Sequence, residues 1–271
     1  MLRLPHLSLT IRGRKLIGRV AFVFLLLCSI ALGAAAGLLF VYASDLPEIR
    51  ALEDYRPNVV TELYADDGQL IGSFALQRRI LISYEQIPPV LKNAVLVTED
   101  QHFEEHWGVD FPRVAQAAYR NLVQMRKAEG ASTLTMQLAG SLFLDRTDRS
   151  FRRKMQETML ATQIERRYTK PQILTMYCNQ VYLAHGMYGV EAASQFYFSK
   201  PTRQLTLTEA ALLAGMIRGP GYSPILHPLR AMARRNLVLD RMANEGKIST
   251  REAQEAVRQP LGLRLQFPRN D

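Results

Sequence analysis

This sequence has few of the residues that build disulfide or metal frameworks: two cysteines and five histidines in 271 residues. Cys28 falls in a long apolar run and Cys178 in a second apolar segment, so we expect no disulfide between them. The histidines are dispersed, and the four-residue spacing of His102 and His106 is more typical of capping or packing than of metal ligation. A disulfide scaffold and a metal site built by the protein are therefore not expected.

Acidic residues are absent before Asp45, and residues 20–44 carry no charge of either sign. At about 1.5 Å per residue, the apolar run 20–42 is long enough to cross a hydrocarbon core of about 30 Å. Because basic residues precede it, the amino end is expected in the cytoplasm and everything after Asp45 outside. A cleaved signal peptide is the alternative, although the run is longer than its usual apolar region. The basic residues are Arg3, Arg12, Arg14, Lys15 and Arg19.

Two functional patterns are also missing. Basic residues do not interleave with aromatic ones as they do in nucleic-acid-binding proteins, so we expect no nucleic-acid partner. No Ser-x-x-Lys motif occurs, which excludes the serine acyl-transfer chemistry that depends on it. The net charge is +9, and removing the five amino-terminal charges leaves about +4, which suits anionic lipid headgroups and pyrophosphates.

Beyond the apolar run, the pattern predicts a mainly helical domain. Residues 45–57 hold two prolines and mixed charge, which indicates a connector. Residues 61–82 partly alternate around Asp66-Asp67-Gly68, which predicts a β-hairpin. The expected helices are 89–106, 111–125, 132–143, 147–167, 171–181, 187–198, 208–216, 229–244 and 250–258.

Glu99 places a carboxylate on an apolar helix stripe. It follows Val95 by four residues and Leu91 by eight, with Phe103 and His106 on about the same side. Because burying an unpaired charge is costly, such a glutamate is paired, raised in pKa, or lines a cleft, where it can act as a general base. On spacing alone, a solvated glutamate at the helix surface is equally compatible.

A second carboxylate, Glu157, continues an apolar ridge of the 147–167 helix toward its amino end, together with Arg153. By itself this spacing fits a surface ion pair worth about 0.3–0.5 kcal/mol equally well. If Glu99 and Glu157 face one groove, they suit glycoside chemistry, in which one carboxyl moves a proton and the other stabilises charge at the sugar.

Five ordered segments resemble the signatures of the family 51 peptidoglycan glycosyltransferases, the transglycosylase domains of penicillin-binding proteins and their monofunctional relatives. The first reads Glu-Asp-x-x-Phe-x-x-His-x-Gly from residue 99, and the second reads Gly-Ala-Ser-Thr-Leu-Thr-Met-Gln-Leu from residue 130. The third, Arg-Lys-Met-Gln-Glu, covers 153–157, and the fourth and fifth lie in 170–198 and 205–215. Five signatures in order are far more specific than one motif.

The resemblance implies a two-lobed, lysozyme-like, mainly α glycosyltransferase domain with a small β-hairpin, preceded by one transmembrane helix. The implied division is a basic cytoplasmic tail 1–19, a transmembrane helix 20–44, a connector 45–57, the glycosyltransferase domain 58–258 and a tail 259–271. The expected location is the bacterial inner membrane, with the catalytic domain on the periplasmic face.

The resemblance also implies a reaction. Glu99 takes the proton from the acceptor's 4-hydroxyl, which attacks the anomeric carbon in one inverting displacement, and undecaprenyl pyrophosphate leaves. Glu157, Arg153 and Lys154 organise the pyrophosphate and a divalent cation, Mg or Mn, and no organic cofactor is implied. The expected partners are lipid II, polyprenyl-pyrophosphate-linked glycan, the membrane, and a transpeptidase or other wall-synthesis proteins.

The remaining site residues follow the same motifs. Ser132, Thr133 and Gln137 match residues that contact donor phosphate or sugar, while Ser132 and Thr133 also fit a helix N-cap. His106 is expected to orient a carboxylate and Phe103 to pack beneath it. The predicted substrate-binding set is Asp100, Phe103, His106, Ser132, Thr133, Gln137, Arg153 and Lys154.

The helix 111–125 has an apolar side flanked by basic residues. This pattern fits core packing or, in a tethered protein, a helix lying in the lipid interface. The family resemblance favours the interface, because both substrates carry polyprenyl tails.

The match also has gaps. The family usually reads Gln-Gln-Leu-x-Lys-Asn where this chain has residues 136–141, so Gly140 replaces a lysine that contacts pyrophosphate, and Thr175 stands where glutamate is common. Two alternatives therefore remain: an accessory protein that binds lipid-linked precursor or a partner without polymerising it, and a lytic, lysozyme-like enzyme. The chain is expected to be monofunctional or the amino-terminal piece of a bifunctional protein.

Overall fold

The computed structural model describes residues 11–47, 61–66, 70–74, 78–124, 130–145 and 147–266. The chain divides into two compact units, Met1–Pro47 and Glu48–Asp271, which are described separately.

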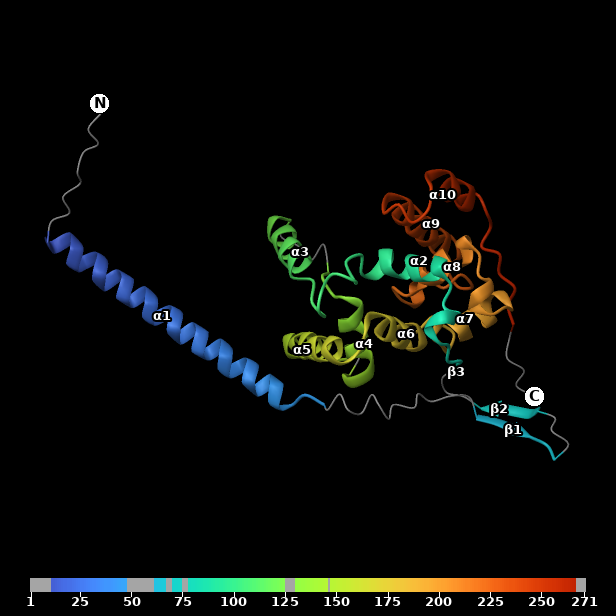
Figure 1. Cartoon of the computed structure of the whole chain (residues 1–271), viewed down its shortest axis with the longest axis horizontal. Helices are drawn as coiled ribbons and strands as arrows, with labels where there is room; N and C mark the ends of the chain where they lie inside the picture. The colour runs from blue at the N-terminus through green and yellow to red at the C-terminus, as the bar shows by residue number, and fades with distance from the viewer. Residues whose placement is uncertain are drawn as a thin grey trace, which may run out of the picture. The chain divides into compact units, whose positions relative to one another are not determined.

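The described part of the first unit is dominated by one helix, α1 (Ile11–Ser44; Figure 1). Its segment Gly18–Ser44 is 27 residues long and apolar enough to cross a membrane, and none of its most apolar window is buried within the protein. The expected apolar amino-terminal helix is confirmed. A signal sequence meets the same criteria, so that alternative stays open.

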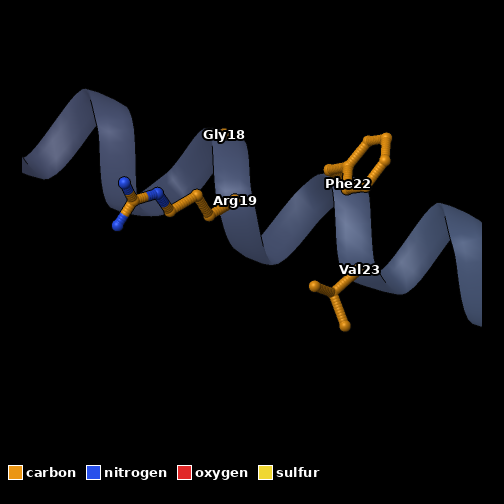
Figure 2. Close-up of a pocket in the computed structure, with 4 residues that line it drawn as sticks. All are labelled: Gly18, Arg19, Phe22 and Val23. Carbon is orange, nitrogen blue, oxygen red and sulfur yellow. The ribbon is translucent and has the colours of Figure 1, made fainter.

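A shallow hollow on α1 is lined by Gly18, Arg19, Phe22 and Val23 (Figure 2). All four residues belong to successive turns of α1, so the residues that line the hollow come from one helix (Figure 2). Because ligand sites need concave walls that bury most of the ligand, we assign no binding site to this hollow.

The strands of the second unit confirm the predicted hairpin. β1 (Thr61–Tyr64) pairs antiparallel with β2 (Leu70–Phe74), with Thr61 opposite Phe74. Asp67 and Gly68 of the predicted turn lie outside the described residues. A second, parallel pair was not expected from the sequence: β3 (Arg78–Arg79) joins β4 (Met187–Tyr188) across more than 100 residues of chain.

The helices of the second unit pack in two groups (Figure 1). In the first, α2 (Pro89–Glu99), α8 (Leu207–Met216) and α9 (Pro228–Asn244) contact one another, and α10 (Thr250–Val257) packs on α8 and α9. The second comprises α4 (Leu134–Phe143), α5 (Phe151–Arg167) and α6 (Lys170–Gln180). α7 (Val190–Phe198) contacts both α6 and α8 and so joins the groups. The predicted mainly α fold is confirmed.

The sequence explains the central place of α8. Every residue from Ala210 to Met216 is buried, and a helix that is apolar all round must be covered on all sides. Its start is fixed by a capping box, in which Thr206 accepts from the Glu209 backbone N–H and the Glu209 side chain accepts from the Thr206 N–H at 2.7 Å. The remaining helical turns are η2 (Tyr84–Gln86), η3 (Thr202–Gln204) and η4 (Pro220–Tyr222).

Two predicted helix boundaries differ most from the structure, by seven residues at the end of α2 and by four at the start of α5. The helix expected over 89–106 ends at Glu99, because the backbone of Asp100 leaves the helical conformation (φ −157°, ψ 82°) and its buried carboxylate bonds to other segments instead. The helix expected to begin at residue 147 begins at Phe151, since Ser150 is its N-cap and accepts a hydrogen bond from the Arg153 backbone N–H.

Residues 259–266 are bonded to the helical domain. The backbone N–H of Arg264 donates to the Tyr197 carbonyl at 2.8 Å, and that of Gln266 to the Phe196 carbonyl at 2.9 Å. The buried Arg235 guanidinium donates to the carbonyls of Gln259 and Pro260. The described part of the segment assigned to a carboxy-terminal tail is therefore tied to α7 and α9.

Candidate active site

Glu99 lies at the end of α2, where the two helix groups meet. Leu91 and Val95, which precede it on the same helix stripe, are fully buried, and Glu99 itself is half-buried. Its Oε2 accepts a hydrogen bond of 2.9 Å from Nε2 of Gln137 on α4. The carboxylate is therefore held by an element of the other helix group rather than left in solvent.

The carboxyl end of a helix disfavours a negative charge, because the helix dipole is negative there. Two arginines offset this at α2. Arg113 donates to the Glu99 carbonyl at 3.2 Å, and Arg241 donates to the Thr98 carbonyl at 3.3 Å. They occupy carbonyls that the helix leaves without partners and place positive charge beside the Glu99 side chain.

A third arginine adds to the positive field around Glu99. Burial lowers the pKa of Arg234, and repulsion from Arg241 and Arg218 lowers it further, whereas the charge of Glu99 acts to raise it. The Arg234 guanidinium also lies over the Tyr222 ring, 5.8 Å from its centre.

Glu157 occupies the first half of α5 with its own cations. Its Oε1 lies 3.2 Å from Arg153 and its Oε2 lies 3.0 Å from the Lys154 ammonium, and the Glu157 side chain is 14% exposed. Lys154 also donates to the hydroxyl of Ser132. Four residues predicted for the site, Ser132, Arg153, Lys154 and Glu157, are thus brought together.

α4 connects the two acids. Gln137 and Gly140 stand three residues apart on this helix and therefore share one face. Gln137 contacts Glu99, and a Cβ atom at Gly140 would lie 2.8 Å from Oε1 of Glu157. The absence of a side chain at residue 140 lets the Glu157 carboxylate approach the helix closely. Both carboxylates therefore meet one side of α4, at residues about one helical turn apart.

Comparison with known proteins identifies the family. A family model described as Transglycosylase matches residues 67–243, more than half of the chain. The chain belongs to the transglycosylase family. This confirms the resemblance to the family 51 peptidoglycan glycosyltransferases and the enzyme class expected from it.

Curated relatives of this transglycosylase include penicillin-binding protein 1A of Aquifex aeolicus, 44% identical over 81% of this chain and 30% of the relative. The protein of the same name from Neisseria gonorrhoeae is 38% identical over 92% and 31%, and that from Escherichia coli 39% identical over 91% and 29%. The chain thus spans about a third of the length of these relatives.

The solved structure of penicillin-binding protein 1A from Haemophilus influenzae aligns with a TM-score of 0.47 at 26% identity, over 79% of this chain and 22% of that one. The family assignment does not depend on it.

Asp100, predicted to bind substrate, is completely buried in this transglycosylase. Its Oδ2 accepts from the Leu134 backbone N–H at 2.8 Å and lies 2.9 Å from Nε2 of His106. Nδ1 of His106 accepts from the Gly108 N–H at 3.1 Å, so the proton of this neutral imidazole is on Nε2 and points at Asp100. The pair joins the end of α2 to the start of α4.

Thr133 serves as the N-cap of α4, one of the two roles considered for it. Its hydroxyl accepts from the Met136 N–H at 3.2 Å, donates to the Gly108 carbonyl at 2.6 Å, and is fully buried. Ser132 is half-buried and bonded to Lys154. Of the two hydroxyls, that of Ser132 is therefore the one placed among the charged site residues.

Phe103 packs against His106 in the loop after α2. It is 1% exposed and meets the His106 ring edge-on, with centroids 6.1 Å apart. A residue that sequence reasoning gave no role, Lys170, lies 4.5 Å from the Phe103 ring centre and donates to the His106 carbonyl at 2.6 Å. Lys170 also pairs with Glu165 at 2.8 Å, so it ties this loop to the junction of α5 and α6.

The departures from the family pattern have local explanations. Met136, where a glutamine is usual, is buried. The Ser141 hydroxyl donates to the Leu138 carbonyl, and that of Thr175 donates to the Pro171 carbonyl. At Gly140, the carboxylate of Glu157 approaches the position where a lysine side chain would begin.

A metal site is not supported by the side chains alone. Among the described residues, no group of three or more His, Cys, Asp and Glu side chains is placed to hold a metal ion. Both oxygens of Glu157 already face cations of the protein. A divalent cation at the pyrophosphate stays a prediction.

Replacing Asp100 by Ala is expected to lower the free energy of unfolding by about 2–5 kcal/mol, because two buried donors lose their acceptor. Urea unfolding of the full chain in detergent micelles, followed by circular dichroism, measures this. Asp145→Ala is the matched control, since Asp145 also accepts two hydrogen bonds but from an exposed position. Equal losses for the two variants would contradict the structural role of Asp100.

Proposed function

We propose that this transglycosylase polymerises lipid II into glycan strands at a bacterial inner membrane. The observation that carries the proposal is the shared face of α4, on which Gln137 meets Glu99 and Gly140 meets Glu157. One carboxylate held by an amide and a second, cation-bound carboxylate at one helix face suit a reaction that removes a proton at one end and releases an anion at the other.

In the proposed step, Glu99 takes the proton of the acceptor's 4-hydroxyl while that oxygen forms a bond to the anomeric carbon of the donor. The bond from this carbon to the pyrophosphate oxygen breaks, and its electron pair leaves with undecaprenyl pyrophosphate. The configuration of the anomeric carbon is inverted, because attack and departure take place on opposite sides.

Lys154 and Arg153 supply the positive charge that the leaving pyrophosphate needs. Glu157 holds both cations by ion pairs of 3.0 Å and 3.2 Å, so they are positioned before substrate arrives. Ser132, bonded to Lys154, adds a hydroxyl on the same side. In this scheme Glu157 acts as an organiser of the anion site rather than as a second proton carrier.

We further propose that α3 (Phe111–Val123) lies in the lipid interface. Of its residues only Ala117 is buried, whereas Phe111, Tyr119, Leu122 and Val123 are all more than 60% exposed. Arg113 and Arg120 belong to the same helix. An apolar surface with basic neighbours suits the boundary between headgroups and acyl chains, where a lipid-linked substrate would enter.

The single tryptophan of the chain, Trp107, is 84% exposed four residues before α3 and can report on this contact. In proteoliposomes, its fluorescence is expected to be quenched by brominated lipids, and Leu122→Glu is expected to reduce this quenching by roughly half. Leu229→Glu on α9, where Leu229 is 81% exposed, is the control and should leave it unchanged. Quenching unaffected by Leu122→Glu would refute the interfacial position.

The orientation with the amino end in the cytoplasm, the transpeptidase partner and the divalent cation belong to the same proposal and rest on the sequence patterns alone. The accessory-protein alternative is supported by Gly140, which stands where other family members have a lysine that contacts pyrophosphate. Labelled lipid II decides among the candidates: long glycan chains indicate a polymerase, bound but unchanged lipid II an accessory protein, and shortened preformed glycan a lytic enzyme.

A further inference from the structure

The amide of Gln137 is held from both ends. Its Nε2 donates to Oε2 of Glu99 at 2.9 Å, and its Oε1 accepts from the hydroxyl of Tyr177 at 3.0 Å. Tyr177 belongs to α6, which packs directly against α4. A chain of two hydrogen bonds therefore runs from the core of one helix group to the carboxylate at the end of α2.

The direction of these bonds follows from the chemistry of the three groups. An ionised carboxylate only accepts hydrogen bonds, so it needs the NH₂ end of the amide. The amide oxygen must then face a donor, and the Tyr177 hydroxyl is one. Burial raises the pKa of Tyr177 well above its usual value, and the charge of Glu99 adds to this, so the hydroxyl keeps its proton.

Without that hydroxyl, the Gln137 amide has no partner on its oxygen in this network. The amide is then free to rotate by half a turn and to place its oxygen against the Glu99 carboxylate, where two acceptors repel each other. The Tyr177 hydroxyl bonds to Gln137, so its hydrogen-bonding effect on Glu99 passes through that amide.

We infer that Tyr177 is a positioning residue for the catalytic base: it fixes the orientation of the Gln137 amide, which in turn holds the Glu99 carboxylate in place. This inference rests on the proposed function in so far as Glu99 is the base. The sequence indicated Tyr177 only as part of a family signature, and it assigned Gln137 to the substrate.

Tyr177→Phe removes the hydroxyl and keeps the buried ring. In lipid II polymerisation by the full chain, kcat is expected to fall roughly tenfold, the effect of one lost hydrogen bond to a charged network, with KM changed less than about twofold. The acid limb of the pH–rate profile is expected to move to higher pH, because a carboxylate that loses a donor binds its proton more tightly.

Tyr197→Phe is the matched control. The Tyr197 hydroxyl is as deeply buried and donates to a backbone carbonyl, that of Leu183, at 2.9 Å. The Tyr197→Phe variant should show a decrease in melting temperature similar to that of Tyr177→Phe, but it should keep the kcat and the pH profile of the parent chain. Equal loss of kcat in the two variants would show that Tyr177 is merely a core residue.

Gln137→Met provides the second test, since methionine matches the shape of glutamine but has neither amide group. In that background, adding Tyr177→Phe should change kcat less than about twofold, because the link between Tyr177 and Glu99 is already gone. A full tenfold further loss would overturn the inference.

A readout independent of lipid II separates this inference from the proposed function. Carbon NMR titration of the Glu99 carboxyl should show a higher pKa in both Tyr177→Phe and Gln137→Met than in the parent chain. An unchanged Glu99 titration in folded Tyr177→Phe overturns the inference, and Gln137→Met decides in the same way if Tyr177→Phe does not fold. If the Glu99 pKa rises in these variants as expected but the parent chain makes no glycan from lipid II, only the proposed function is overturned.

Discussion

Glu99→Gln is expected to abolish glycan polymerisation while leaving the fold intact. The substitution removes the proton acceptor, and loss of a general base lowers rates by roughly 100- to 10,000-fold. The folded state should be retained, because the amide oxygen of the new glutamine can accept the same hydrogen bond from Gln137 and the buried Leu91 and Val95 are untouched. Chain length on gels, with labelled lipid II and the full chain in micelles, measures the effect.

The control is Glu104→Gln, which removes a carboxylate five residues away that is exposed in the loop after α2. Its activity should match that of the parent chain. An active Glu99→Gln enzyme would refute the assignment of the base, and an inactive Glu99→Gln variant whose melting temperature has collapsed would mean that the glutamate is needed for folding instead.

The second large effect is expected for Lys154→Met. Lys154 joins Ser132 and Glu157 and, in the proposed step, faces the leaving pyrophosphate. Removing one group that stabilises developing charge lowers kcat by roughly 100- to 1,000-fold. Methionine retains much of the apolar length of the side chain, so the packing against Ser132 is largely preserved.

Lys200→Met is the matched control for Lys154, because it breaks a similar lysine–glutamate pair, Lys200 with Glu209 at 2.7 Å. We expect near-parental release of polyprenyl pyrophosphate from Lys200→Met and strongly reduced release from Lys154→Met. If both variants lose little activity, the charge of Lys154 is not used in the reaction.

Local patterns predicted most of the elements. The apolar run before Asp45 indicated α1, and the alternation around residue 66 indicated the β1–β2 hairpin. The 3.6-residue periodicity indicated the remaining helices, with most of their ends within a few residues of the observed ones. The clear failure was the helix expected through His106. The periodicity continues past Glu99, but a buried tertiary hydrogen bond from Leu134 to Asp100 ends the helix there.

The site was predicted less completely. Motif order predicted Glu99, Glu157, Arg153 and Lys154 as reacting or charge-stabilising groups, and the structure brings the last three together and places Glu99 and Glu157 on one face of α4. Thr133 proved to be fully occupied as the cap of α4, and Asp100 as a buried acceptor. The same side chain can cap a helix or bind a substrate, so the sequence alone does not distinguish these two roles.

The roles of Tyr177, Arg241 and Lys170 had no signal of their own. Tyr177 and Lys170 lie in a family segment but look there like ordinary core and surface residues, and Arg241 is one of several basic residues in α9. Their contacts with Gln137, the Thr98 carbonyl and the His106 carbonyl join positions 40, 143 and 64 residues apart. Such contacts depend on how helices pack.

By itself, the sequence determined that this chain has a long uncharged amino-terminal segment, a mainly helical domain and the acid and base residue types of a glycosyltransferase, because hydrophobic period and residue chemistry are local properties. Only the tertiary structure decided that Glu99 and Glu157 meet one face of α4, and that Gln137 is held between Tyr177 and Glu99. That arrangement depends on the packing of α2, α4, α5 and α6, which no local pattern specifies.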